Sequence, residues 1–383
     1  MDNPFSYGSP VEGPRFTDRE EELAALVACM ANGQNVILSA PRRFGKSSLL
    51  KAAVVAARER GVRVGMARLM GCSSKEQVAQ RLAAAISDQA MGWLQGHVEE
   101  FRRHLASIRP GVSLMLTEDG FRVSVAPGTT GEADWGEVTR GLIRAAARIG
   151  GGERRVALVL DEFQRVAEVD GGSLPGVFKD LVDELPNVSL VVAGSTAHLM
   201  RMLTEGGGAP LMGIGQRINL GPIPEDRMVA FLSARFAAGG QSIRQDAAHT
   251  LCDLAHGVPN SVQQLAFWTF EERAEKIDAA VVEKALDRAV SLQDQEFTDK
   301  FERLSPLQQR ILLLLASQRE PYAGLHRKET YRILGASPNG VTTAVRALSE
   351  TEIVVDLHPA EPHTPSRWQI LDCFFARWVA RLG

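Results

Sequence analysis

The sequence predicts an α/β protein, in which a parallel β-sheet covered by helices is followed by a helical segment and a C-terminal winged helix-turn-helix. The segments Val156–Leu160 and Leu190–Gly194 are continuously apolar, as expected of strands buried on both faces of a parallel sheet. Residues 225–290 show helical patterning, broken at Gly239-Gly240 and at Gly257-Val258-Pro259. From Ser305 onward, a helix, two short helices and an apolar strand follow in the order of a winged helix-turn-helix.

The expected domain boundaries follow from these breaks in pattern. A chain of 383 residues is long enough for two or three domains. We predict an α/β core at residues 1–223, a helical domain at 224–291 and a winged-helix domain at 292–383. A β-hairpin insertion is expected at about 110–128, because apolar residues alternate on both sides of Asp119-Gly120.

The elements of the core are predicted by local signals. The first helix should follow a capping box that runs from Thr17 to Glu20. The remaining expected elements, in chain order, are a strand at 35–38, a helix at 45–60, a strand at 62–69, helical sequence at 75–108, and strands at 156–160, 190–194 and 218–223.

Composition restricts the class of protein. The formal net charge is −3, so the whole chain has no excess of positive charge that would attract nucleic acid or acidic lipid. The four cysteines lie far apart in sequence, which disfavours a zinc site or a disulfide framework and favours reduced thiols. The N-terminal residues lack a signal-peptide pattern, and no apolar run approaches the ~20 residues that cross a bilayer. We therefore expect a cytoplasmic protein with no membrane contact.

A short loop with a glycine and a lysine joins the first predicted strand to the next helix. Its residues Ala40-Pro41-Arg42-Arg43-Phe44-Gly45-Lys46-Ser47 match the phosphate-binding pattern GxxxxGK followed by Ser or Thr, except at the first position. In this pattern backbone N–H groups surround the phosphates, the lysine neutralises the β- and γ-phosphates, and the hydroxyl binds Mg²⁺. Ser48 is a candidate for the α-phosphate. The loop therefore predicts a site for ATP or ADP with Mg²⁺.

Ala40 stands where the pattern has glycine. Its Cβ is tolerated if the backbone angle φ is negative, whereas a positive φ would strain the loop and weaken phosphate binding. The alternative interpretation is a chance Gly-Lys-Ser at a strand–helix junction. The position of the motif after a buried strand and before a helix argues against chance.

The paired carboxylates Asp161 and Glu162 end the apolar strand that begins at Val156. In a protein with a phosphate-binding loop, the first carboxylate of such a pair holds Mg²⁺ and the second orients the attacking water. Taken alone, two carboxylates after a strand also fit a loop start or a helix cap. We predict the metal role for Asp161 and the catalytic role for Glu162.

Two further residues are candidates for contact with the γ-phosphate. Ser195 ends the next buried strand, where it is either a phosphate sensor or a turn former. Arg217 precedes the last predicted strand, where it serves either as an arginine finger or as half of a surface salt bridge.

These motifs together resemble the archaeal-type ATPase family, a branch of the AAA+ and STAND-like P-loop proteins. The resemblance spans almost the whole chain in the family's order. Its most specific parts are Pro41–Lys46 and Asp161–Gln164. The other matching stretches are Asn3–Phe5, Phe16–Leu23, Gly194-Ser195, Gly257–Pro259 and Trp368–Trp378.

The resemblance implies an AAA+ core, a helical lid and a C-terminal winged helix. It implies that the segment before the first helix cradles adenine, which assigns Val11, Phe16 and Arg19 to the cofactor. Pro259 falls where other AAA+ proteins carry a sensor-2 arginine, and the lack of that arginine argues for a nucleotide-dependent switch over a fast ring motor. Departures from the family are Ala40, Ser47 in place of Thr, and two extra residues before Arg217.

Three functions remain open at this point. The first is a regulatory ATPase whose slow hydrolysis controls the binding of a protein partner through the winged helix. The second is a DNA-binding, replication-initiator-like ATPase. The charge of the C-terminal domain argues against it, because residues 292–383 carry 11 Lys/Arg against 11 Asp/Glu. The recognition helix expected at 339–349 has Arg346 as its only basic residue. The third is a nucleotide-binding scaffold that does not hydrolyse ATP. The sequence does not define the oligomeric state.

Overall fold

The computed structural model divides into two compact units. Unit 1 consists of Met1–Asp18, Pro41–Gly45 and Gly221–Gly383, and unit 2 consists of Arg19–Ala40 and Lys46–Leu220. The structure describes residues 2–11, 13, 16–86, 112–117, 120–125, 135–149, 155–170, 174–195, 203, 209–318, 320–357 and 366–383. No helix within these ranges is long and apolar enough to cross a membrane.

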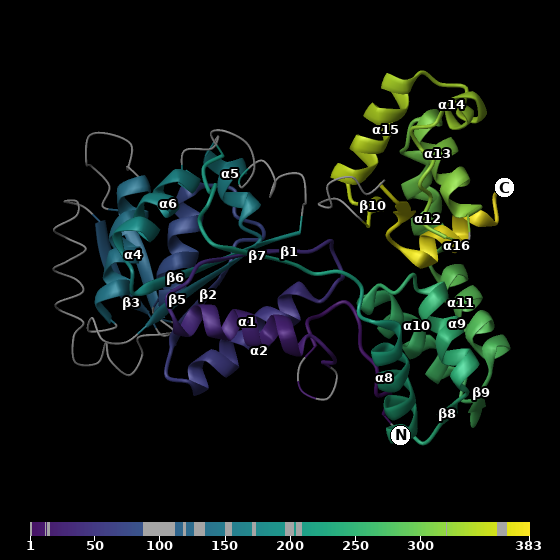
Figure 1. The fold of residues 1–383 in the computed structure, drawn as a ribbon, viewed down its shortest axis with the longest axis horizontal. Helices are drawn as coiled ribbons and strands as arrows, with labels where there is room; N and C mark the ends of the chain where they lie inside the picture. Colours follow the sequence, from purple (N-terminus) through teal and green to yellow (C-terminus); the bar gives the residue numbers. More distant parts are fainter. Residues whose placement is uncertain are drawn as a thin grey trace. The chain divides into compact units, whose positions relative to one another are not determined.

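A five-stranded parallel sheet organises unit 2 (Figure 1). Every neighbouring pair in it is parallel. Its strands in spatial order are β2 (Arg63–Arg68), β5 (Val156–Asp161), β6 (Val188–Gly194), β1 (Val36–Ser39) and β7 (Gln216–Asn219). All residues of β5 and β6 are buried, as their continuous apolar sequence predicts. Because β6 lies between β1 and β5, the carboxyl ends of these three strands meet at one edge.

Helices cover both faces of this sheet. Figure 1 shows α1 (Glu20–Ala31) and α2 (Lys46–Glu59) on one face, with α4 (Trp135–Ile149), α5 (Gln164–Asp170) and α6 (Leu174–Glu184) on the other. Residues 75–86 are also helical, and the rest of the predicted helix at 75–108 lies outside the described residues. The apolar sides of these helices and the strand residues form the core of unit 2.

The predicted hairpin is confirmed. Strands β3 (Val112–Thr117) and β4 (Gly120–Val125) pair in antiparallel register around the position predicted for the turn. The two residues that join them lie outside the described residues. The alternation of apolar residues therefore identified a pair that interrupts the strand–helix order of the sheet.

The capping box predicted at Thr17 is wrong. Helix α1 begins at Glu20, and its N-cap is Arg19, which has φ 72° and makes no side-chain cap bond. Asp18 is left-handed as well, with φ 58°. These two left-handed residues separate Thr17 from the helix. Thr17 therefore does not cap the helix, although its spacing to Glu20 is that of a capping box.

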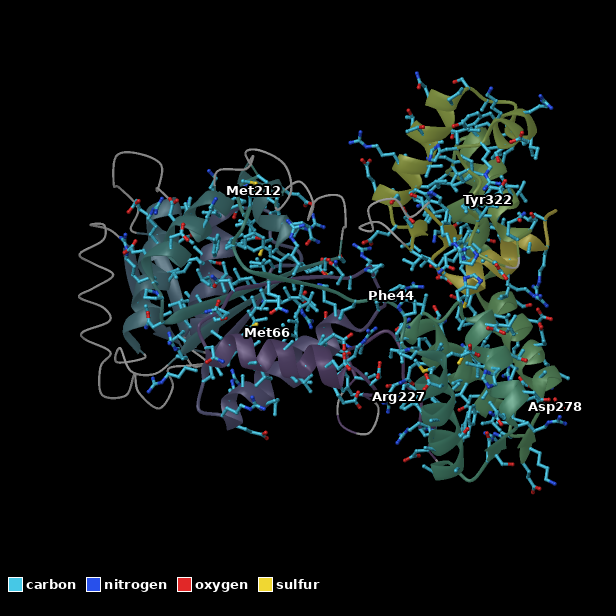
Figure 2. The ribbon with its side chains drawn as sticks, viewed as in Figure 1. Phe44, Met66, Met212, Arg227, Asp278 and Tyr322 are labelled. Atoms are coloured by element: carbon cyan, nitrogen blue, oxygen red, sulfur yellow. The ribbon has the colours of Figure 1, made fainter. Side chains whose placement is uncertain are left out.

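The larger part of unit 1 begins with a helical segment after the sheet. It contains α8 (Glu225–Ala238), α9 (Gln245–Leu254), α10 (Pro259–Glu271) and α11 (Ala279–Leu292), with short strands β8 (Ser242–Ile243) and β9 (Lys276–Ile277). The N-terminal segment packs here, since the Phe5 and Phe236 rings have centroids 4.6 Å apart. Asp278 caps α11 by accepting a hydrogen bond from the Val281 N–H (Figure 2).

We call residues 294–383 of unit 1 the C-terminal region. Its elements in chain order are α12 (Asp294–Glu302), α13 (Pro306–Ala316), α14 (Lys328–Leu334), α15 (Pro338–Glu350), β10 (Val354–Asp356), β11 (Trp368–Ile370) and α16 (Cys373–Ala380). β10 and β11 are antiparallel, and Tyr322 (Figure 2) bridges to Trp368. The helix, two further helices and strand expected after Ser305 are present in that order as α13, α14, α15 and β10, and the winged helix itself stays a prediction.

One hydrophobic core joins the helices at 225–292 to the C-terminal region. The residues of this core come from both sides of residue 292, where a domain boundary was predicted. That boundary stays a prediction. All four cysteines are buried free thiols, two of them in this core.

Candidate nucleotide-binding site

Three strand ends bring the candidate residues together at one edge of the unit 2 sheet. Ser39, the last residue of β1, pairs with Gly194 of β6. Asp161, the last residue of β5, pairs with Ala193 of β6. The three strands therefore stop at nearly the same level, and Ser195 follows directly on the middle one.

Lys46, the first residue of α2, is the cation of this edge. Its ammonium group contacts an Asp161 oxygen and donates a hydrogen bond to Glu162 Oε1 at 2.9 Å. The exposed fractions of the three side chains are 6%, 2% and 10%, so the cluster is screened little by solvent. Ser47 Oγ donates to the other oxygen of Asp161 at 2.9 Å.

Glu162 is held from several directions. Its Oε2 accepts hydrogen bonds from Gln164 Nε2 at 2.6 Å and from Ser195 Oγ at 3.0 Å. Burial by itself raises the pKa of this carboxyl, but the charge of Lys46 and the hydrogen bonds from Lys46, Gln164 and Ser195 outweigh burial, so the pKa is lowered. Glu162 also has φ 61°, a strained conformation for a residue with a Cβ, which is typical of functional sites.

The loop at 41–45 has the backbone that phosphate binding needs. Gly45 has φ 88° and Arg43 has φ 71°, and alternation between ordinary and left-handed residues turns successive N–H groups toward one side. Ala40 is not among the residues with positive φ, so its Cβ is compatible with the loop. Phe44 is buried, and Figure 2 marks its position.

The structure places the predicted site residues unequally. Lys46, Ser47, Asp161, Glu162 and Ser195 form the bonded cluster described above. Ser48 is buried in α2, and Pro259 is the first residue of α10. The remaining candidates take no part in the hydrogen bonds and ion pairs described above for this cluster. They are Val11, Phe16, Pro41, Arg42 and Arg43 in unit 1, and Arg19 and Arg217 in unit 2.

Arg217 lies on the edge strand β7, where it is exposed and pairs in register with Ile37. That register is level with Leu160, one residue before Asp161. Arg19 is buried and forms an ion pair with Glu22 at 2.9 Å. The roles suggested for these two arginines stay predictions.

Gln164 is a site residue to which the sequence analysis assigned no role. Its side chain is buried, its amide nitrogen holds Glu162, and its Oε1 has no hydrogen-bond partner within the described part of the chain. The only sequence signal was its place two residues after Glu162. A buried acceptor without a partner beside an ionised carboxylate is suited to hold a water molecule.

The donor set at this edge fits Mg²⁺. A hydroxyl oxygen of Ser47 and a carboxylate oxygen of Asp161 lie in direct contact, and both are hard oxygen ligands of the kind that Mg²⁺ prefers. The N-terminus of the 14-residue helix α2 adds a favourable end for phosphate. Ser47 and Asp161 are thus the residues that would hold the metal.

Solved structures align with this chain over nearly its whole length. The Walker-type ATPase of Pyrococcus abyssi aligns with TM-score 0.62 and 18% identity over 95% of this chain and 96% of that chain. The ORC2 protein of Aeropyrum pernix, in ADPNP-ADP complexes, aligns with TM-score 0.55 and 15% identity over 99% and 97% of the two chains. The ORC1 protein of Aeropyrum pernix, in complex with DNA, aligns with TM-score 0.51 and 17% identity over 98% and 96%.

The chain has the fold of AAA+ P-loop ATPases. The predicted α/β fold with a parallel sheet is thereby confirmed, whereas the helical lid and the winged helix stay predictions. No family model and no curated protein matches the sequence. Because the identities to the solved structures are low, the likeness establishes the fold and leaves the activity to be argued from the site.

The buried charges of this cluster make a prediction for stability. We expect Lys46→Met to lower the free energy of unfolding by about 3–5 kcal/mol without nucleotide, because two buried carboxylates lose their counter-charge. Urea denaturation measures the change. Adding Glu162→Gln to Lys46→Met should recover part of the loss.

Lys179 provides the control for this experiment. It lies on α6 of the same unit and forms no ion pair within the described residues. Lys179→Met should therefore leave stability nearly unchanged. Equal, small losses of stability in Lys46→Met and Lys179→Met would contradict the conclusion that Lys46 compensates the two buried carboxylates.

Proposed function

We propose that this protein is an ATP-dependent regulatory switch that hydrolyses ATP slowly. ATP or ADP binds with Mg²⁺ at the loop 40–48, and the nucleotide state controls the binding of a protein partner by the C-terminal region. The observation that carries the proposal is the buried cluster of Lys46, Asp161, Glu162 and Ser195 at the ends of three parallel strands.

The residues of the cluster have separate tasks in this proposal. Lys46 exchanges its two carboxylate partners for the β- and γ-phosphates, while Ser47 and Asp161 hold Mg²⁺. When bound, the metal ion neutralises charge that develops on the phosphates. Before nucleotide binds, Lys46, Gln164 and Ser195 lower the pKa of Glu162. The hydrogen bonds from Gln164 and Ser195 do not depend on Lys46, and they favour the ionised carboxylate that accepts a hydrogen bond from the attacking water.

The two oxygens of Glu162 are bound differently, which favours a nucleotide-triggered site. Oε2 is held by Gln164 and Ser195, whereas Oε1 is held by Lys46. When Lys46 turns to the phosphates, Oε1 becomes available for water and Oε2 keeps the carboxylate in place. Lys46 thus holds Glu162 Oε1 until nucleotide binds, which supports a site that becomes active only when nucleotide is bound.

The start of α10 supports a switch over a fast motor. Its first turn is Pro259-Asn260-Ser261, preceded by Val258, so no cation stands where other AAA+ proteins carry a sensor-2 arginine. Without that cation, this end of the lid segment supplies no charge to stabilise phosphoryl transfer. Slow hydrolysis suits a protein in which the bound nucleotide sets the conformation.

The surface of α15 supports a protein partner for the C-terminal region. Arg346, its only cation, forms an ion pair with Glu350 at 2.8 Å. The other exposed positions of the helix include Asn339, Thr342 and Thr343, which are neutral. A helix that reads DNA needs cations free to face phosphate, and this one offers a single paired arginine.

A DNA-binding, initiator-like function is the second candidate. The fold likeness to an ORC1 protein solved in complex with DNA favours it. The charge balance of residues 292–383 and the pairing of Arg346 weigh against it. A scaffold that binds nucleotide without hydrolysis is the third, and the behaviour of Glu162 variants distinguishes it.

Loss of Lys46 should abolish nucleotide binding. We expect Lys46→Met to bind Mg²⁺ and ATP too weakly to detect by calorimetry, because the fixed cation beside the β- and γ-phosphates is removed. Lys179→Met is again the control and should bind normally. Wild-type affinity in Lys46→Met would refute the site.

Glu162→Gln should separate binding from hydrolysis. Glutamine keeps the size of the side chain but cannot take up charge, so we expect normal affinity and a turnover lower by about 10²-fold or more. Phosphate release under single-turnover conditions measures this effect. Glu168→Gln, on an exposed pair with Arg165 in α5, is the control. If Glu162→Gln turns over as wild type does, Glu162 is only a structural cap.

DNA affinity distinguishes the first two candidates. We expect the full-length protein to bind duplex DNA no tighter than about 10⁻⁴–10⁻⁶ M near physiological salt, with little sequence preference, with or without ATP. Fluorescence anisotropy with duplexes of different sequence measures this. Arg346→Ala should change the affinity little. Clearly tighter, sequence-dependent binding would favour the initiator-like function.

A further inference from the structure

The phosphate-binding loop at Pro41–Gly45 belongs by its contacts to unit 1, although it joins β1 to α2 of unit 2. Two arginines of the loop form ion pairs with acidic residues of the C-terminal region. Arg42 pairs with Glu352, and Arg43 Nη1 donates to Asp372 Oδ2 at 2.7 Å. We call these two pairs the loop clasp.

Backbone bonds reinforce the clasp. The Asn260 N–H, in the first turn of α10, donates to the carbonyl oxygen of Arg43 at 3.2 Å. Asn260 Oδ1 in turn accepts from the Gly8 N–H at 3.0 Å. Arg43 is therefore held through both its side chain and its carbonyl group.

Arg43 needs this support because of its backbone. A residue with a Cβ at φ 71° is strained relative to glycine. The strained angle is part of the left-handed geometry that turns the N–H groups of the loop toward phosphate. Contacts that hold Arg43 in place consequently hold the phosphate-binding geometry of the loop.

We propose that Asp372 is a positioning residue for the nucleotide site, acting through Arg43, so that the site is complete only when the C-terminal region is in contact with the loop. This inference rests on the proposed function and adds its means of regulation. By reciprocity, a nucleotide that binds the clasped loop better also strengthens the contact of the C-terminal region. The clasp is thus the link between nucleotide state and partner binding.

The surroundings of Asp372 suit a contact that forms and breaks. Its Oδ1 caps α16 by accepting from the N–H groups of Phe374 and Phe375, independently of Arg43. Lys300, placed over the Phe375 ring at 4.4 Å from its centroid, acts electrostatically on both Asp372 and Arg43. The Asp372 side chain is 16% exposed, so breaking the clasp does not leave a fully buried carboxylate without a partner.

A double-mutant cycle tests the inference. Asp372→Asn removes the charge but keeps a side chain that caps helices well, and Arg43→Gly removes the guanidinium while permitting positive φ. We expect Asp372→Asn to weaken the affinity for Mg²⁺ and ATP, measured by calorimetry, on the order of fivefold. In the Arg43→Gly background the same substitution should have no further effect.

Asp278→Asn is the matched control. Asp278 is also a helix-capping aspartate of unit 1, at the start of α11 (Figure 2), and it makes no ion pair within the described residues. It should leave affinity unchanged. If Asp372→Asn weakens binding equally with Arg43 and with Gly at position 43, Asp372 supports only the fold of the C-terminal region, and the inference fails. Unchanged or tighter binding in Asp372→Asn overturns it as well.

Unfolding without nucleotide separates this inference from the proposed function. It is measured for the wild type, Arg43→Gly, Asp372→Asn and the double variant. Non-additive losses of stability for Arg43→Gly and Asp372→Asn would support the pair, whereas additive losses would overturn it. A wild-type protein that binds no ATP would refute the proposed function instead.

Discussion

The site depends on one buried ammonium group shared between two carboxylates. Lys46 compensates Asp161 and Glu162 in surroundings where an unpaired charge is costly. Neutral residues of similar size would pack there at lower cost, so the arrangement is explained by use and not by stability. With two carboxylates and one cation, the cluster carries an excess negative charge that suits it to receive a metal ion.

The order of the strands makes this cluster possible. In this order β6 is the neighbour of both β1 and β5. Because β6 lies between them, Ser195 follows at the same edge and binds the oxygen of Glu162 that Lys46 does not hold. The parallel pairing then places the carboxyl ends of the strands at the same edge of the sheet, where Asp161, Glu162 and Ser195 meet.

The fold was predictable where a single physical signal dominated. β5 and β6 are buried on both faces, so their sequences are continuously apolar and cannot be read as amphipathic helices. The strand expected at 218–223 lies instead at Gln216–Asn219, because pairing with β1 ends where the chain meets Gly221 and Pro222. The capping box at Thr17 failed because two left-handed residues separate it from the helix.

The site was predictable only in part, for a related reason. Motifs identify residues that are close in sequence, such as Lys46 with Ser47 and Asp161 with Glu162. The pairing of Arg43 with Asp372 joins residues 329 positions apart, and the local sequence around either residue does not predict the other. Gln164 likewise shows its role only through its bond to Glu162. Contacts of this kind are decided by tertiary packing, which local patterns do not encode.

The loop at Pro41–Gly45 explains how a small ligand can influence a distant surface. The loop is covalently continuous with β1 and α2, so any shift of its backbone is felt at Lys46 and thereby at both carboxylates. Its side chains are engaged by Glu352 and Asp372, which flank the β10–β11 pair of the C-terminal region. A five-residue segment with two strained or left-handed positions has few ways to move. In the proposed function, phosphate binding and release would act on a loop that favours discrete states, which is the property that a switch requires.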